Sequence, residues 1–152
     1  MNWYHTVSSD LSQLPNAIVY FESELTDAKQ DARLVGNIEK ATAAMPGIIE
    51  HRFNQLQEIE AILQYLNIEL KKVKGKHFRK YFESYAKALT SREVEKYVEH
   101  EQEVVDYELL VNDFALLRNK WLGIVKGLDQ KSFALSNVIR LRVAGMEDAS
   151  IV

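Results

Sequence analysis

The chain lacks cysteine and is poor in proline and glycine. It has no Cys, two Pro and six Gly in 152 residues. The absence of Cys excludes disulfides, thiolate metal sites and a cysteine nucleophile, and it is typical of a reducing compartment. Because turns depend on Gly and Pro, a chain with so few of them is expected to contain few turns and long secondary-structure elements.

Signals for export or for crossing a membrane are also missing. The first ten residues, MNWYHTVSSD, have neither a basic start nor an apolar run, and nowhere do about 18 consecutive apolar residues occur. With 47% hydrophobic and 27% charged residues, the composition is that of an ordinary globular protein, and the length fits one domain. We therefore expect a soluble, cytoplasmic protein with a single helical domain over residues 1–152 and no contact with membranes.

Residues 1–46 are predicted to form the N-terminal helices. Residues 2–14 form one or two short turns, and a helix runs from Pro15 to about Val35, because Pro15 is near the first helical position and Gly36 lies just past the end. A shorter helix over residues 37–45 is expected to stop before Pro46, since a residue that precedes proline is pushed out of the helical region.

Residues 47–89 are predicted to form one long helix. Its apolar residues recur at steps of three and four, which is a strong amphipathic signal. They are Ile49, Phe53, Leu56, Ile59, Leu63, Leu66, Leu70 and Val73. A helix of about 40 residues is roughly 60 Å long, with Gly75 as its weak point.

Residues 90–145 are predicted to form a second long helical region, followed by a frayed tail over 146–152. Thr90 and Glu93 form a capping box at its start, and Gly145 is expected to cap its end, with a weakening around residues 127–130. A tight connection between the two long helices makes an antiparallel hairpin. The predicted fold is therefore all-α: a long antiparallel helical hairpin, packed like a coiled coil, with shorter N-terminal helices.

One heptad-like seam stands out in the second helical region. Its residues are Leu110, Phe114, Leu117, Trp121, Ile124 and Leu128. The seam is either the inner face of a monomeric bundle or a surface between subunits. We expect a homo-oligomer with these six residues in its interface, because Phe114 and Trp121 are large anchors of the kind that interfaces favour.

No local signature of an enzyme is present. The four histidines, His5, His51, His77 and His100, are scattered, and none has a second histidine four residues away. The chain has no phosphate-binding glycine loop, no nucleophile elbow and no EF-hand loop. We expect a protein that is not an enzyme, with no catalytic residues, no metal and no cofactor.

Charge is arranged in blocks along the chain. Residues 1–50 carry seven acids against three bases, residues 71–80 carry six bases and no acid, and residues 92–108 carry seven acids against two bases. Although the net charge is −3, binding is decided by the local field rather than by the sum. The basic run over residues 71–80 is therefore the feature that most directly suggests a function.

The basic run presents a coherent face on a helical wheel. Lys72, Lys76 and Arg79 lie opposite the apolar stripe with Lys80 beside them, whereas Lys71 and Lys74 lean toward the stripe. Such a face attracts a polyanion through counterion release. The other interpretations are a solvated helix face and an anionic membrane surface.

Aromatic residues lie among and after these charges. Phe78, Tyr81 and Tyr85 continue the apolar face and are expected to pack in the core, while Phe82 is at the border near Arg79, where it could stack on a nucleic-acid base.

The acidic run over residues 93–108 has three interpretations. Its members are Glu93, Glu95, Glu99, Glu101, Glu103, Asp106 and Glu108. We rank a solvated face first and pairing with the basic run of a neighbouring subunit second. In the third interpretation the acids shield the basic run of their own chain until nucleic acid displaces them.

The ending LLVNDFALLRNKWLGIVKGLDQKSFALSNVIRLRVAG resembles the C-terminal helical region of the phage T4-type recombination mediator family, the UvsY family. The shared pattern is a long apolar helix, the stretch Gln130-Lys131-Ser132-Phe133-Ala134, and an amphipathic helix that ends in Ala144-Gly145. A basic helix closely followed by aromatic residues precedes this region in the family, as in residues 76–82 here. The resemblance covers roughly half of the chain.

The resemblance implies a small, helical, non-enzymatic protein that assembles into rings and binds single-stranded DNA. Members of the family help to load a recombinase onto strands coated by a single-strand-binding protein. By the family's pattern Lys76 and Arg79 contact DNA, and the helical wheel adds Lys72 and Lys80. The expected partners are single-stranded DNA, a recombinase and a single-strand-binding protein, in the host cytoplasm if the chain is phage-encoded. The alternative is a coiled-coil structural or adaptor protein that does not bind nucleic acid.

Overall fold

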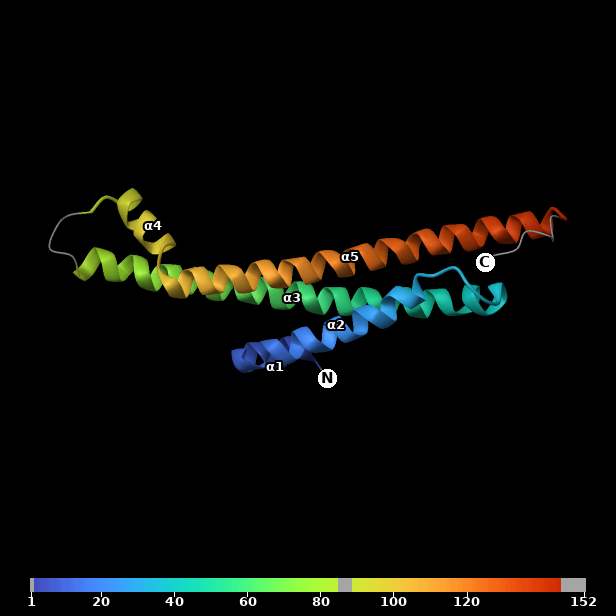
Figure 1. Ribbon diagram of the computed structural model, residues 1–152, viewed down its shortest axis with the longest axis horizontal. Coiled ribbons are helices and arrows are strands. Elements are labelled where there is room, and N and C mark those ends of the chain that lie inside the picture. The colour runs from blue at the N-terminus through green and yellow to red at the C-terminus, as the bar shows by residue number, and fades with distance from the viewer. Residues whose placement is uncertain (1, 85–88, 146–152) are drawn as a thin grey trace.

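The computed structural model describes residues 2–84 and 89–145, and the only regular secondary structure in these residues is helical (Figure 1). The elements in chain order are α1 (Trp3–Ser9), the short 3-10 helix η1 (Leu11–Gln13), α2 (Leu14–Asp31), α3 (Ile38–Ser84), α4 (Ser91–Glu99) and α5 (Gln102–Val143). The molecule is elongated because α3 and α5, with 47 and 42 residues, lie side by side along most of its length. The predicted all-α antiparallel hairpin with short N-terminal helices is confirmed.

The pairing of α3 with α5 follows from their apolar spacing. Leu56, Ile59 and Leu66 are buried on α3 and meet Phe114 and Trp121 of α5 in the central core. A residue three or four positions along a helix returns to the same face, so each helix presents one continuous stripe to the other. Two smaller clusters extend this core toward the two ends of the hairpin.

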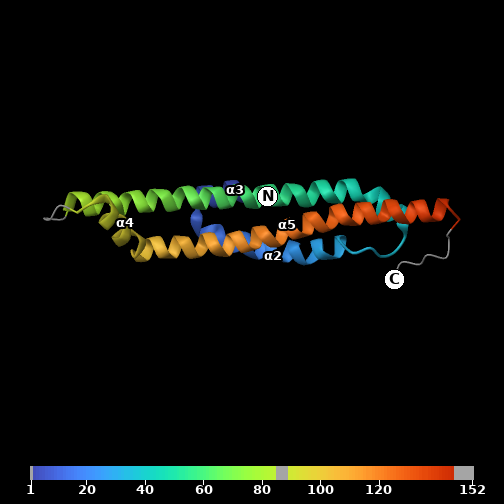
Figure 2. The same cartoon turned by 90° about the horizontal axis from the view of Figure 1, so that it is seen from above.

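The N-terminal helices cover one side of the hairpin near its middle (Figures 1 and 2). Asn2 caps α1 and Asp10 caps η1, each by accepting a hydrogen bond from a backbone N–H two or three residues on. Glu58 of α3 accepts a hydrogen bond from the backbone N–H of Trp3, which ties the start of α1 to the long helix. Phe21 of α2 inserts its ring edge-on against Trp121, and both side chains are fully buried.

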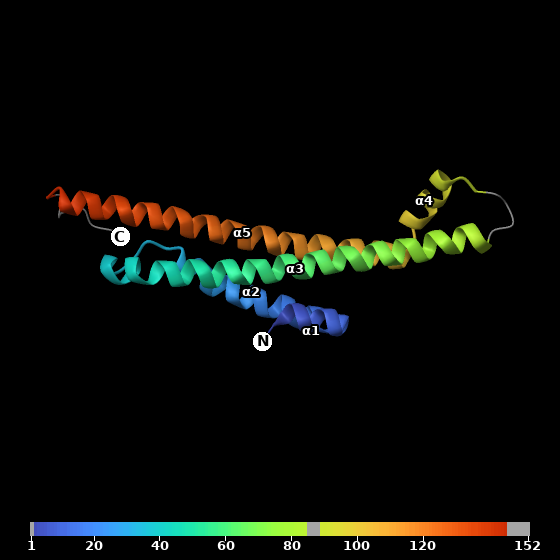
Figure 3. The ribbon, with the colours of Figure 1, turned by 180° about the vertical axis from the view of Figure 1, so that it is seen from behind.

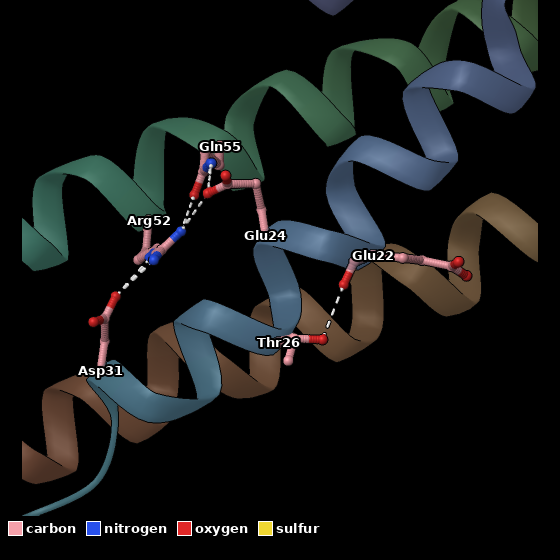
Figure 4. Close-up of polar contacts among 6 residues, drawn as sticks. All are labelled: Glu22, Glu24, Thr26, Asp31, Arg52 and Gln55. Atoms are coloured by element: carbon pink, nitrogen blue, oxygen red, sulfur yellow. Dashed lines mark hydrogen bonds and ion pairs between the residues drawn. The ribbon is translucent and has the colours of Figure 1, made fainter.

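A buried arginine joins α2 to α3 (Figure 4). The Arg52 guanidinium lies 2.8 Å from both Glu24 and Asp31 of α2, and Gln55 completes the network at 2.9 Å from Arg52 and 3.0 Å from Glu24. The guanidinium carbon also lies 6.0 Å from the centre of the Trp121 ring. The two carboxylates at separate turns of α2 therefore fix its position along α3.

The predicted break before Pro46 is wrong, because α3 runs without interruption from Ile38 to Ser84. A proline inside a helix leaves the carbonyl four residues earlier without its N–H donor. Here that carbonyl belongs to Thr42, and both Thr42 and Pro46 are exposed, so water can serve it. Ile38 and Met45 are buried against α5, and this contact favours a helix on both sides of the proline.

Other predicted boundaries are also corrected. Helix α2 ends at Asp31, four residues before the expected Val35, although Gly36 does adopt a left-handed φ of 83°. Helix α3 ends at Ser84, and the expected continuation over residues 85–88 lies outside the described residues. Helix α5 is continuous through residues 127–130, where Leu128 is buried in the same cluster as Leu135, about two turns further along the helix.

The second long helical region, predicted over residues 90–145 without a break near residue 100, is divided at His100–Glu101 into α4 and α5 (Figure 3). The Thr90–Glu93 capping box at the start of α4 is confirmed, with both reciprocal hydrogen bonds present. Gly145 follows the end of α5 with a φ of 82°, as expected of a glycine cap. The expected tail, 146–152, lies outside the described residues. None of the helices described here is long and apolar enough to cross a bilayer.

Candidate nucleic-acid interface

The basic run occupies the last turns of α3, where one face is held in a core. Leu70 and Val73 are buried against Val94 and Val98 of α4 and Val104 of α5. These three valines can enter one cluster only because the chain bends at residues 100–101 and folds α4 back over α3. The run is thus presented on a helix that is fixed along its inner side.

The four predicted contact residues lie on the outer side of this helix. The Lys72 and Lys76 side chains are 69% and 71% exposed, and Arg79 and Lys80 are also exposed. Lys74 is half-exposed and points toward α5, as the helical wheel predicted. Lys71 is exposed, so the prediction that it leans toward the apolar stripe is wrong.

Three lysines of the run form ion pairs. Lys72 pairs with Glu69 one turn earlier at 3.1 Å. Lys74 and Lys76 reach across to α5, where their Nζ atoms lie 3.3 Å from Glu108 and 3.5 Å from Glu103. Arg79 and Lys80, like the exposed Lys71, form no ion pair within residues 2–84 and 89–145, so these charges are available to an incoming anion.

His77 lies at the centre of the contact between α3 and the start of α5. It is buried, with Nε2 2.8 Å from Glu103 and Nδ1 3.9 Å from Glu101. Since an ionised carboxylate only accepts, Nε2–H is the donor to Glu103. This hydrogen bond is the main cause that lowers the pKa of Glu103 below its usual range.

Glu101 holds the bend between α4 and α5. Although it occupies the N-cap position of α5, its side chain does not cap the helix. It accepts a hydrogen bond of 2.5 Å from the Tyr81 hydroxyl instead, and this bond is the main cause that lowers the pKa of Glu101. Both acids at the bend are therefore held in the charged form by side chains of α3.

The aromatic residues divide between core and surface. Phe78 and Tyr81 are partly buried against the valine cluster, as predicted, and Tyr85 lies outside the described residues. Phe82 is 46% exposed and its ring centre lies 4.7 Å from that of Phe78. Tyr97 of α4 is exposed and stacks on Tyr81 at 5.6 Å. Two exposed rings, Phe82 and Tyr97, thus flank the basic run.

A groove of about 380 Å³ runs between α3 and α4 beside the run. Its lining residues are Lys74, Gly75, Phe78, Glu95, Val98 and Glu99. Gly75 is helical and exposed, and a side chain built there would meet no atom within 4 Å. The expected weak point therefore does not interrupt α3.

The acidic run is divided among several roles. Glu93 completes the capping box of α4 by accepting a hydrogen bond from the Thr90 N–H, and Asp106 accepts one from Gln102. The side chains of Glu101, Glu103 and Glu108 contact α3. These three are therefore not a purely solvated face, which was the interpretation ranked first: Glu103 and Glu108 pair with Lys76 and Lys74 of the same chain, whereas Glu101 contacts Tyr81 and His77.

The six seam residues face the core of their own chain. Phe114, Trp121 and Leu128 are fully buried and Leu117 is nearly so. Leu110 and Ile124 are partly buried against the same core. This corrects their assignment to a surface between subunits: they form the inner face of a single-chain bundle.

Sequence reasoning did not single out Tyr97 or the contact of His77 with the two glutamates. Their proximity depends on the bend at residues 100–101, where neither proline nor glycine marks a break. The available signal for the bend is the spacing of Val94, Val98 and Val104. The first two valines are four residues apart and the next two are six apart, so the three cannot share one face of a straight helix.

Comparison with known protein families, curated proteins and solved structures finds no match to this chain.

Proposed function

We propose that this chain binds single-stranded DNA through the outer face of α3 and assists recombination or repair as a non-enzymatic homo-oligomer. Lys72, Lys76, Arg79 and Lys80 supply the contacts to phosphates, and Phe82 stacks on a base. The observation that carries the proposal is the row of exposed cations on one rigid helix, with Arg79 and Lys80 unpaired within the described part of the chain.

The arrangement suits a single strand better than a duplex. Phe82 is an exposed ring beside the cations. Such a ring can stack only on a base that is not already stacked between its neighbours, as bases are in a duplex. Every base has a π-face, so binding of this kind is tolerant of sequence. The resemblance to recombination mediators adds two proposed protein partners, a recombinase and a single-strand-binding protein.

The test is the affinity for a fluorescent oligothymidine as a function of salt. Wild type is compared with Lys76→Ala/Arg79→Ala and with the matched control Lys120→Ala/Lys126→Ala, which removes two exposed lysines of α5. On a single strand each neutralised phosphate contributes about 0.7 to the slope of log affinity against log salt. The first pair should lower the slope by about 0.7–1.4 and the control should leave it unchanged. Absent wild-type binding at low salt, or an unchanged slope in the first variant, would refute the proposal.

A second candidate is a structural or adaptor protein, which the ion pairs of Lys74 and Lys76 favour. In that case the basic run holds α3 to α5 and binds no nucleic acid. Neutralising the run should then change the assembly size, which native mass spectrometry with and without the oligonucleotide would measure. Unchanged assembly together with salt-dependent DNA binding would exclude this candidate.

A further inference from the structure

We propose that the start of α5 is a built-in competitor of DNA: Glu103 and Glu108 occupy Lys76 and Lys74 where phosphates would otherwise bind. This inference rests on the proposed function and concerns the regulation of the same surface. It predicts that only part of the basic run is available in the free protein, and that removing the two acids makes the chain bind DNA more tightly.

The geometry places these carboxylates where phosphate oxygens would lie. Glu103 Oε2 is 3.5 Å from Lys76 Nζ and 2.8 Å from His77 Nε2, so a single oxygen bridges two cationic or donor groups of α3. Glu108 Oε1 is 3.3 Å from Lys74 Nζ. An anion that approaches α3 along its α5 side therefore finds its sites already taken.

The acids are held in place by contacts that do not involve the lysines. Val104, next to Glu103, is fully buried in the valine cluster, and Glu101 accepts its hydrogen bond from Tyr81. The start of α5, and Glu103 with it, therefore remains close to α3 whether or not Lys76 is paired. Because they belong to the same chain, dilution does not weaken their competition as it would for a free anion.

The competition is nevertheless of modest strength. The Glu103 and Glu108 side chains are 43% and 42% exposed, and exposed ion pairs of this kind are largely screened by salt. A lysine whose charge is balanced by a carboxylate neutralises no phosphate and adds nothing to the salt slope. Once the carboxylate is removed by substitution, each lysine should contribute a further 0.7 or so.

The experiment compares wild type with Glu103→Gln/Glu108→Gln in binding to oligothymidine over a range of salt. Freeing two lysines should steepen the slope of log affinity against log salt by about 1.4, that is, by about 0.7 for each lysine. If the two proteins bind equally at 1 M salt, the variant should bind about 25-fold more tightly at 0.1 M salt. The matched control is Glu95→Gln/Glu99→Gln, which removes two exposed acids of α4 beside the same groove that form no ion pair in the described part of the chain. Circular dichroism should show equal helicity in all three proteins.

The outcomes separate this inference from the proposed function. If the two glutamine variants gain affinity equally, the gain comes from the change in net charge alone, and the proposal that Glu103 and Glu108 compete with DNA is refuted. If wild type binds but Glu103→Gln/Glu108→Gln gains neither slope nor affinity, the competitor is refuted while the proposed function stands. If none of the three proteins binds at low salt, both are refuted.

Discussion

Replacement of Arg52 by Met is expected to destabilise the fold far more than loss of an exposed arginine. The Arg52 side chain is 8% exposed and contacts two carboxylates, each at 2.8 Å. Breaking a fully buried ion pair costs about 3–5 kcal/mol because a charge is left without a partner. Glu24 and Asp31 retain 27% and 29% exposure, so water can partly replace the guanidinium and the expected loss is about 2–3 kcal/mol.

The measurement is thermal unfolding followed by circular dichroism. A loss of this size lowers the midpoint by about 5–10 °C for a chain of about 150 residues. Arg118→Met is the matched control, because Arg118 is 34% exposed and lies 3.8 Å from Glu60, an arrangement worth less than about 1 kcal/mol. Equal midpoints for the two variants would refute the view that the Arg52 network fixes α2 on α3.

Three further predictions concern helix backbone, capping and acid. Gly75→Ala should stabilise the chain by about 0.5–1 kcal/mol, because the site is helical and open. Gly36→Ala should destabilise it, because the φ of Gly36 is 83°. A urea unfolding midpoint that is higher for Gly36→Ala than for Gly75→Ala would contradict this. Thr90→Ala should cost about 1 kcal/mol through loss of the capping box, with increased hydrogen exchange in α4 as its sign. Glu24 and Glu93 have pKa values below the ordinary 4.5, so their contribution is complete above that pH and is lost as the pH falls through the folded values. The melting temperature should therefore fall on acidification below about pH 4.5, and a flat profile there would contradict the assignment.

Much of the fold could be predicted because its core follows simple helical spacing. Leu56, Ile59, Leu66 and Leu70 were placed correctly in the stripe of α3 for this reason. Phe53 was predicted to join them but is exposed. On that part of α3 the buried positions are held by Arg52 and Gln55, which contact Glu24 and Asp31 of α2. A search for apolar residues at helical spacing cannot detect a buried network of polar side chains.

The helix boundaries were harder to predict because tertiary contacts decide them. Met45, buried against α5, holds the helix through Pro46 against the local preference. At residues 100–101 the reverse occurs: a sequence without a helix breaker bends, because Val94 and Val98 reach the core only if α4 folds back.

The candidate interface could be predicted in part. The exposure of Lys72, Lys76, Arg79 and Lys80 follows from the helical wheel alone. Which acid pairs with which lysine does not, since Lys76 and Glu103 are brought together by the bend between α4 and α5. From the sequence, contact between the acidic and basic runs of one chain was one of three possibilities, and the fold shows such ion pairs for Glu103 and Glu108.

The salt dependence of single-strand binding by the unmodified protein tests the central claim most directly. Affinity for oligothymidine should fall as salt rises, with a slope between about −1.4 and −2.8 for each subunit that contacts the strand. The lower magnitude corresponds to Arg79 and Lys80 alone and the higher one to all four cations. Binding that is absent at low salt, or that does not change with salt, would contradict the claim that the outer face of α3 holds single-stranded DNA.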